Sequence, residues 1–208
     1  MPLSNGSLDH QDVRGQLAAV ARELYQAGVL TALGGNLSAR VTNMECAWIT
    51  PTRVYKGGLV PEDMVRIDYR GQMVAGPPGM APSEEASVHA AVYRAREDAA
   101  AVVHAHPPHT IIMATIDLPV RAVTEEIAAY VDVPRLAYQP SGSEGLASAV
   151  SAALGDGDLV MVANHGVFAA GPTLRAAASN VLSLEAACRL TLLAHQFGVG
   201  ELPEMDEG

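Results

Sequence analysis

The sequence predicts an α/β domain in which a mixed sheet is flanked by helices. Short apolar runs typical of buried strands alternate irregularly with segments of helical periodicity. The chain has 208 residues, of which 49% are hydrophobic and 17% charged, so it fits one folded domain with one core. No repeat, low-complexity stretch or linker divides it. We expect a flexible leader over residues 1–9, a single domain over 10–197 and an acidic tail over 198–208.

Helices are expected where apolar residues recur at helical spacing and a capping residue stands at one end. Val13, Leu17 and Val20 follow this spacing, and Gly28 stands where a C-cap would be. Ser83 is a suitable N-cap for a helix that begins at Glu84. The five expected helices cover residues 10–27, 84–96, 109–116, 143–154 and 173–197.

Strands are expected at the apolar and β-branched runs between these helices. A Gly-rich turn leads into the first of them, and Pro107-Pro108 end the strand that contains AVVHAHP. The segment 118–136 is ambiguous between helix and strand. The expected strands lie within residues 33–41, 46–50, 64–69, 100–106 and 158–163, and residues 72–82 are expected to form a strand remnant followed by a Pro/Gly loop.

Charge and composition exclude several classes of partner. The formal net charge of −10 argues against binding to nucleic acid or to an anionic membrane, and no apolar stretch is long enough to span a bilayer. Cys46 and Cys188 are interpreted as packing residues rather than a disulfide. Because no signal peptide is seen at the N-terminus, a cytoplasmic enzyme is expected. A small anionic substrate would have to bind through local cations.

Three histidines at the ends of apolar runs indicate a metal site. His104 and His106 are two residues apart, so in a strand both imidazoles lie on one face. His165 follows another apolar run, and Glu85 supplies a carboxylate. Three imidazoles and one carboxylate suit a divalent metal such as zinc, although a single histidine in an apolar strand is more often a core residue with backbone hydrogen bonds. His10, His89 and His195 fall in expected helices and are interpreted as structural.

A set of short motifs, in order along most of the chain, resembles a known family. They are Gly34-Gly35-Asn36-Leu37-Ser38, Ile49-Thr50-Pro51-Thr52, Pro82-Ser83-Glu84-Glu85, His89, His104-Ala105-His106 and Asn164-His165-Gly166. Each motif is weak alone, but together the chain from about residue 10 to 197 resembles the class II aldolase/adducin-head family, which includes fuculose-phosphate aldolase.

This resemblance implies a fold, an assembly and a set of metal ligands. The implied fold is an α/β/α sandwich around a largely antiparallel sheet, and the implied assembly is a homotetramer with active sites between subunits. By resemblance, His104, His106 and His165 match the zinc-ligating histidines, and Glu85 matches the carboxylate that both ligates the metal and acts as acid or base. Manganese, cobalt or iron would accept the same ligands. His109 matches a further family histidine and is assigned to substrate binding.

The predicted substrate cradle departs from the sugar-phosphate pattern of the family. Asn36, Thr52 and Ser83 match the family's phosphate-binding positions, whereas Arg53 replaces a glycine and Glu84 replaces a serine. A carboxylate beside a phosphate would repel it, at a cost of about a kcal/mol or more at close range. Arg53 has two alternative interpretations: it makes a bidentate contact with a substrate carboxylate, or it pairs with Glu84.

Lys56 lies nearby in the sequence and could add positive charge to this cradle. The simpler interpretation is that it is a solvated surface lysine.

The sequence also lacks the tyrosine that family aldolases take from an adjacent subunit as proton donor. Val123 occupies that position, and no tyrosine follows Tyr138. Thr124, Glu125 or Glu126 would have to substitute, although Glu125 and Glu126 also read as a surface acid pair. Decarboxylation needs no such donor, because it needs an electron sink and a later protonation of carbon.

Two reactions therefore compete, and loss of carbon dioxide is favoured. The expected substrate is a small hydroxylated carboxylic acid. An aromatic acid of the dihydroxyphthalate type is possible, because decarboxylases of hydroxylated aromatic acids occur in the family and the apolar stretch 109–116 would suit a ring. The alternative is a class II aldolase that cleaves a sugar phosphate or hydroxy-ketone. Epimerase, dehydratase and non-catalytic adducin-like roles are less favoured.

Overall fold

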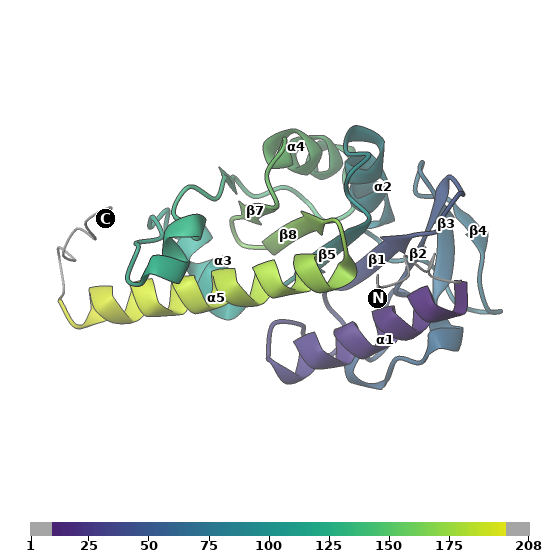
Figure 1. Ribbon diagram of the computed structural model, residues 1–208, viewed down its shortest axis with the longest axis horizontal. Helices are drawn as coiled ribbons and strands as arrows, with labels where there is room; N and C mark the ends of the chain where they lie inside the picture. Colours follow the sequence, from purple (N-terminus) through teal and green to yellow (C-terminus); the bar gives the residue numbers. More distant parts are fainter. Residues whose placement is uncertain (1–9, 199–208) are drawn as a thin grey trace, which may run out of the picture.

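The computed structural model describes residues 10–198, which form one eight-stranded sheet with helices on both sides (Figure 1). The expected leader over residues 1–9 and all but the first residue of the expected acidic tail lie outside the described residues. The strands are β1 (Asn36–Arg40), β2 (Cys46–Ile49), β3 (Val65–Asp68), β4 (Met73–Ala75), β5 (Ala101–Ala105), β6 (Arg135–Leu136), β7 (Leu159–Val162) and β8 (Gly166–Gly171). Their order in the sheet is β4-β3-β2-β1-β5-β8-β7-β6, and every neighbouring pair is antiparallel except β6–β7.

Two separate cores cover the two faces of this sheet. The helices are α1 (His10–Gln26), α2 (Ala86–Ala95), α3 (Pro108–Thr115), α4 (Glu144–Leu154) and α5 (Leu174–Gln196), with short 3₁₀ helices η1 (Lys56–Gly58), η2 (Pro61–Asp63) and η3 (Glu125–Tyr130). Helices α1, α3 and α5 share one core with the sheet, and α2 and α4 share the other. Successive residues of β5 alternate between them, since Val103 belongs to the first core and Val102 to the second. The predicted α/β/α sandwich with a largely antiparallel sheet is confirmed.

The structure differs from the expected elements in three places. Strand β8 was not expected, because its sequence GVFAAG combines glycine and alanine and shows neither a β-branched run nor alternation. The ambiguous segment 118–136 contains η3 and the short strand β6. Helix α2 begins at Ala86 rather than Glu84, and Ser83 accepts a hydrogen bond from the Glu85 N–H (3.2 Å) in the turn that precedes it.

The sequence also predicted that the two cysteines are packing residues and that no segment spans a membrane. Cys46 and Cys188 are both buried and unpaired with each other, in keeping with packing roles. Within the described residues, no helix combines the length and apolarity needed to cross a bilayer.

Candidate metal centre

The sheet brings the predicted ligands together at one end of its central strands. The β1–β5 register sets Asn36 opposite His104, at the start of β1 and near the end of β5. His106 follows β5 directly, and His165 lies in the tight turn between β7 and β8. Because antiparallel neighbours alternate in direction, the start of β1, the end of β5 and the start of β8 meet at the same edge.

Glycines allow the backbone to approach the histidines closely. Asn164 adopts a left-handed conformation (φ 56°) in the turn before β8. A Cβ atom on Gly166 would lie 2.1 Å from the carbonyl oxygen of Ala105, so only glycine fits there. A Cβ atom on Gly34 would likewise lie 2.8 Å from Nδ1 of His106. These two glycines therefore keep the space in which the imidazoles meet.

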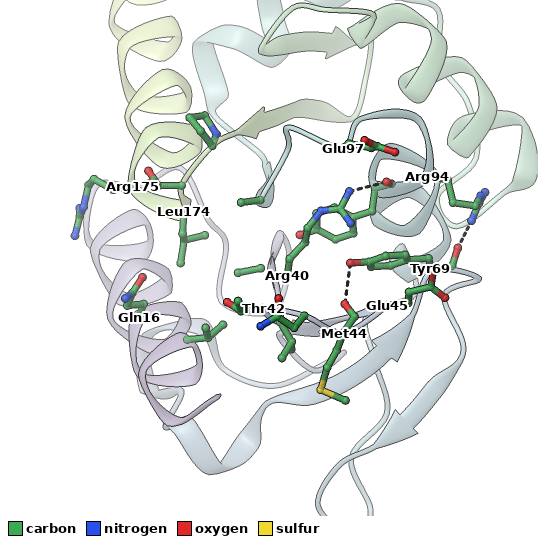
Figure 2. A pocket seen from close by; sticks show the side chains of 18 residues that line it. Gln16, Arg40, Thr42, Met44, Glu45, Tyr69, Arg94, Glu97, Leu174 and Arg175 are labelled. Atoms are coloured by element: carbon green, nitrogen blue, oxygen red, sulfur yellow. Dashed lines mark hydrogen bonds between the residues drawn. The ribbon is translucent and has the colours of Figure 1, made fainter. Parts of the chain in front are cut away.

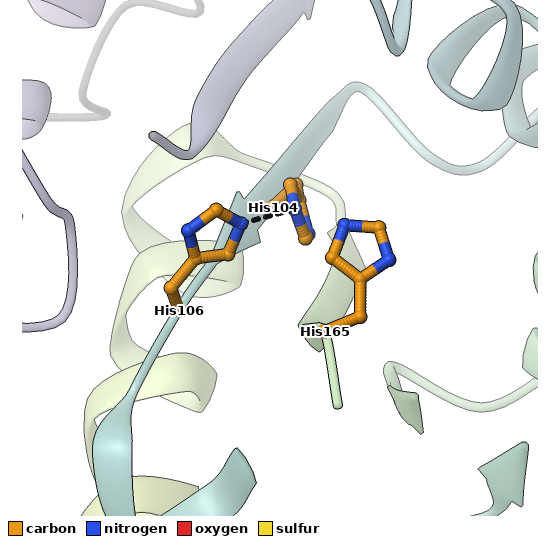
Figure 3. A group of neighbouring side chains, drawn as sticks. All are labelled: His104, His106 and His165. Carbon is orange, nitrogen blue, oxygen red and sulfur yellow. Dashed lines mark hydrogen bonds between the residues drawn. The ribbon is translucent and has the colours of Figure 1, made fainter. Parts of the chain in front are cut away.

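The three imidazole rings converge on one point, as Figure 3 shows. One nitrogen from each of His104, His106 and His165 lies within 4.8 Å of the others, and the Nε2 atoms of His104 and His106 are 2.9 Å apart. Nδ1 of His104 donates to the carbonyl of Val167 (3.0 Å), which leaves its Nε2 as the nitrogen that faces the other rings. The His104 ring is also stacked on Phe168, with ring centroids 4.1 Å apart.

Glu85 completes the group from the turn that leads into α2. Its Oε2 lies 3.1 Å from Nε2 of His104, and its Oε1 lies 3.0 Å from Nε2 of His165. Glu85 and His104 are buried. The structure thus brings together all four side chains that the sequence analysis assigned to the metal.

The protonation states of these groups suit a divalent cation. Burial lowers the pKa of His104 to about 3, and burial followed by the neighbouring His165 lowers the pKa of His106, so these rings are neutral at neutral pH. Burial by itself would raise the pKa of Glu85, but His104, His165 and Asn36 together hold it well below its usual range. Neutral imidazoles and an ionised carboxylate are the donor forms that zinc requires.

One contact within the group favours a bound cation. Because Nδ1 of His104 donates to Val167, the lone pair of its Nε2 faces the Glu85 carboxylate, with 3.1 Å between Nε2 and Oε2. Two acceptors at this distance repel each other, and a cation that takes both as ligands would turn the repulsion into attraction. The residues present therefore fit a divalent metal.

A buried chain of hydrogen bonds supports Glu85 from behind. Because an ionised carboxylate only accepts, Asn36 donates through Nδ2 to Glu85 Oε2 (2.9 Å). The Asn36 Oδ1 atom then accepts from Nε2 of His89 (2.6 Å), which leaves Nδ1 of His89 to accept from Ser38 (2.6 Å). The Ser38 hydroxyl in turn accepts from Tyr93 (2.7 Å). Each member thus has a fixed direction of donation, ending at Glu85.

The structure gives His89 a place in this chain beyond that of a packing residue. It was expected only as a structural histidine in a helix. The signal that would have found it is its spacing from Glu85, since positions four residues apart share a helix face.

A small polar cavity of about 120 Å³ opens beside the ligands. Asn36, Thr52 and Ser83 line it, as the sequence analysis expected of substrate-binding residues. Two further lining residues were not expected there: Ser141, which donates to Glu85 Oε1 (3.0 Å), and Lys56. The prediction that Lys56 is a solvated surface lysine is wrong, because the folded loop buries it to 1% exposure.

Two other predicted substrate-binding residues lie elsewhere. Arg53 pairs with Glu84 (2.8 Å) and its side chain is 80% exposed, so of the two interpretations of Arg53 the structure shows the ion pair. Arg53 is not among the residues that line the cavity. His109 is held by Glu185, with Nδ1 2.6 Å from Oε1, and none of the residues 109–116 lines this cavity within the described chain.

A larger hollow of about 790 Å³ lies at the opposite ends of the same strands (Figure 2). Its arginines already have partners: Arg40 donates to three backbone carbonyls, Arg94 donates to the carbonyl of Tyr69, and Arg175 pairs with Glu23. No cluster of potential metal ligands lies there within the described residues. The small cavity beside the histidines is therefore the candidate active site.

The fold is an α/β/α sandwich, and three imidazoles and a carboxylate converge beside a polar cavity at one edge of its sheet. These features are typical of a metal-binding α/β enzyme. The family described as Class II Aldolase and Adducin N-terminal domain matches residues 15–192, and the chain belongs to this family. The L-fuculose phosphate aldolase of Methanocaldococcus jannaschii is 30% identical over 179 residues, 86% of this chain and 94% of that protein. The 3-oxo-tetronate 4-phosphate decarboxylase of Escherichia coli is 28% identical over 189 residues, 88% of this chain and 87% of that protein.

The fold comparison agrees with the sequence comparison. The solved structure of an L-fuculose 1-phosphate aldolase matches with a TM-score of 0.83 at 29% identity, covering 96% of this chain and 94% of that chain. The predicted family and fold are confirmed, as is the assignment to metal-dependent lyases.

Proposed function

We propose that the chain is a divalent-metal-dependent decarboxylase of a small hydroxylated carboxylic acid, with zinc as the favoured metal. The observation that carries this proposal is the convergence of His104, His106, His165 and Glu85 beside a polar cavity. Decarboxylation is favoured over aldol cleavage because Val123 stands at the position of the tyrosine that family aldolases use as proton donor. The similarity to a 3-oxo-tetronate 4-phosphate decarboxylase supports the same reaction class. The cavity is small and polar, which favours a short polyhydroxylated acid over an aromatic one.

A metal bound by these ligands would act as a Lewis acid toward the oxygens next to the bond that breaks. The chain's own groups would orient the substrate and manage the proton. Thr52 and Ser83 supply hydroxyls at the cavity wall, and Asn36 and Ser141 fix the direction of the Glu85 carboxylate. The step requires a substrate with a carbonyl at position 3, as in a hydroxylated 3-oxo acid. The bond between the carboxylate and the neighbouring carbon breaks, carbon dioxide leaves, and the electron pair passes into that carbonyl. The carbon that has lost the carboxylate then takes a proton that Glu85 delivers from solvent.

The test is a comparison of two products from the same zinc-loaded protein. Short 3-oxo and hydroxy acids, with and without a phosphate group, together with a dihydroxyphthalate, are offered in turn, and carbon dioxide and aldehyde are both measured. We expect one equivalent of carbon dioxide from a short acid, loss of activity with a chelator, and recovery with zinc. Absence of carbon dioxide across the whole panel would contradict the proposal.

Aldol cleavage is the second candidate because the relatives include named aldolases. It requires another proton donor, since Val123 is packed against the core rather than offering a hydroxyl. Glu125 and Glu126, the other candidates, are exposed at the start of η3 and are not among the residues that line the cavity of this chain. Release of an aldehyde from fuculose or ribulose phosphates would favour this reaction. Epimerase and dehydratase activities are less favoured alternatives that would use the same ligand set. A non-catalytic adducin-like role is less well supported, since all four proposed ligand side chains are present.

The assembly belongs to the same proposal. We expect a homotetramer in the cytoplasm with active sites at subunit interfaces, as the resemblance to the family implies. In such an assembly His109, oriented by Glu185 and 37% exposed at its side chain, would contact the substrate from the rim of the site.

A further inference from the structure

Lys56 is the only lysine in the chain; the other twelve strongly basic side chains are arginines. It is also among the largest fully buried side chains of the molecule, at 1% exposure. Lysine is rarely fully buried unless its charge is paired. The placement of this single lysine therefore calls for a partner.

The described contacts of the ammonium group are to neutral atoms. Nζ donates to the carbonyls of Pro51 (3.0 Å) and Val54 (3.2 Å), which brace the turn that contains Arg53. An ammonium group has three N–H donors, so these contacts occupy two of them. Lys56 takes part in none of the ion pairs of the described chain. Burial lowers its pKa to about 8, which reflects a positive charge that lacks a counter-charge.

Lys56 lies at the wall of the cavity that the metal ligands share. Pro51 and Thr52 line the same wall, and His106, His165 and Glu85 line the cavity as well. The Lys56 backbone N–H donates to the carbonyl of Ala32 (2.9 Å), which ties the loop to the Gly-rich segment before β1.

The other charges around the cavity are already paired. Glu84 is held by Arg53 on the exposed side, and Glu85 accepts hydrogen bonds from Asn36 and Ser141 and would be neutralised by the metal. Lys56 is thus the cation of the cavity that an anion can still neutralise.

We propose that the Lys56 ammonium binds an oxyanion of the substrate, a phosphate or second carboxylate distant from the metal, in the role that the sequence suggested for Arg53. This inference rests on the proposed function only in that the substrate is anionic. The Thr52 and Ser83 hydroxyls, which line the same cavity, would complete the binding of that group. A bound oxyanion compensates the desolvated charge of Lys56, whereas Arg53 continues to neutralise Glu84.

Because the chain has one lysine, selective labelling can observe it alone. Zinc-loaded protein made with ¹³C,¹⁵N-lysine should give one lysine spin system, whose side-chain shifts are followed through a pH titration without and with inorganic phosphate, and separately with acetate. We expect phosphate or acetate to raise the pKa of Lys56, and the stronger of the two identifies the kind of oxyanion. A pKa that neither anion moves would overturn the proposal.

Three variants separate the roles of the two cations. Lys56→Met should weaken phosphate or acetate binding in calorimetry by at least about tenfold, which corresponds to about 1.4 kcal/mol. Arg53→Met should weaken it far less, and Arg70→Met, at an exposed turn, controls for the change in net charge. Zinc content should be unchanged in Lys56→Met, because the described hydrogen bonds of the Lys56 ammonium are to Pro51 and Val54 and not to the proposed ligands. Loss of anion binding in Arg53→Met but not in Lys56→Met would contradict the assignment.

These measurements do not depend on turnover. If no carbon dioxide is released from any acid but the Lys56 signal responds to phosphate, the anion site stands and the proposed reaction fails. If Lys56→Met does not fold, the labelled unmutated protein alone decides the question.

Discussion

The residues behind Glu85 determine where its carboxylate points. Asn36 and Ser141 each donate to one of its oxygens, and His104 and His165 face the same two oxygens. Loss of a group that orients a metal ligand in this way typically lowers metal affinity or activity by about 10- to 100-fold. The geometry of the site therefore depends on the neighbours that hold the Glu85 carboxylate as well as on the histidines.

Removing one ligand tests the centre directly. In His106→Ala the metal loses a nitrogen donor while the sheet keeps its buried residues, so zinc content should fall to near zero with little change in circular dichroism. Metal analysis of the dialysed protein measures this. His195→Ala, at an exposed position in α5, is the matched control and should retain one zinc per chain. Full zinc content in His106→Ala would remove this residue from the site.

The buried histidine behind Asn36 should make stability depend on pH. Burial lowers the pKa of His89 to about 4, whereas an unfolded histidine has a pKa of about 6.5. Between these values the unfolded chain binds more protons, so the free energy of unfolding falls as the pH falls, by about 2 kcal/mol from pH 7 to pH 5.

Comparison with a variant isolates this contribution from other acid-sensitive groups. His89→Gln cannot be protonated, so urea denaturation of the metal-free variant should show a smaller loss of stability between neutral and mildly acidic pH than the unmutated protein. Equal losses in the two proteins would show that His89 does not carry the effect.

Sequence patterns predicted which side chains cluster, namely the three histidines and Glu85, but not the burial of the residues around them. The spacing of His104 and His106 implies a shared face in any strand, so this part of the site was accessible from local geometry. The burial of Lys56 depends on how the 51–56 loop folds against the Gly-rich segment before β1. Such a contact between separate loops has no local signature, and lysine is ordinarily exposed.

At the scale of elements, a side chain of one helix caps the N-terminus of another. Helix α3 begins at Pro107-Pro108 with no side-chain cap of its own. Glu185 of α5 accepts from the backbone N–H groups of His109 (3.1 Å) and Thr110 (2.9 Å), and also from the Thr110 hydroxyl. A carboxylate at a helix N-terminus also interacts favourably with the helix dipole. Glu185 therefore joins the α5 layer to the helix that follows the ligand strand.

Loss of this carboxylate should destabilise the fold more than loss of a surface acid. Glu185→Ala leaves the first N–H groups of α3 without an acceptor and should lower the free energy of unfolding by about 2 kcal/mol in urea denaturation. Glu126→Ala, at an exposed position, should change it little. Similar stabilities for the two variants would mean that water replaces Glu185 at the helix start.

Helices were predicted correctly where the apolar periodicity and the capping residue agreed. Ser143 and Thr173 were expected at helix starts and accept hydrogen bonds from Leu146 and Ala176 there. Strand β8 escaped prediction because its small residues suit close contact with β5 and β7 rather than any intrinsic β preference. Whether such a segment forms a strand depends on long-range packing, which a local sequence pattern does not contain.

At the scale of the whole molecule, one surface carries apolar side chains that a single copy leaves exposed. Leu182, Leu190, Leu193 and Phe197 lie on one side of α5, with 37%, 37%, 38% and 79% exposure. The C-terminal turns of α5 extend to one end of the molecule (Figure 1). An apolar stripe of this kind supports the proposed self-association, since exposed apolar patches commonly mark interfaces.

Introducing charge on this stripe separates assembly from metal binding. The double variant Leu193→Glu, Phe197→Glu should convert a tetramer of about 87 kDa, four chains of 21.7 kDa, into smaller species in light scattering. Its zinc content should stay at one per chain, because all four ligands belong to one copy. If the active sites lie between subunits, turnover should fall sharply in the same variant. Unchanged turnover by a monomer would show that a single copy supplies every residue that the reaction needs.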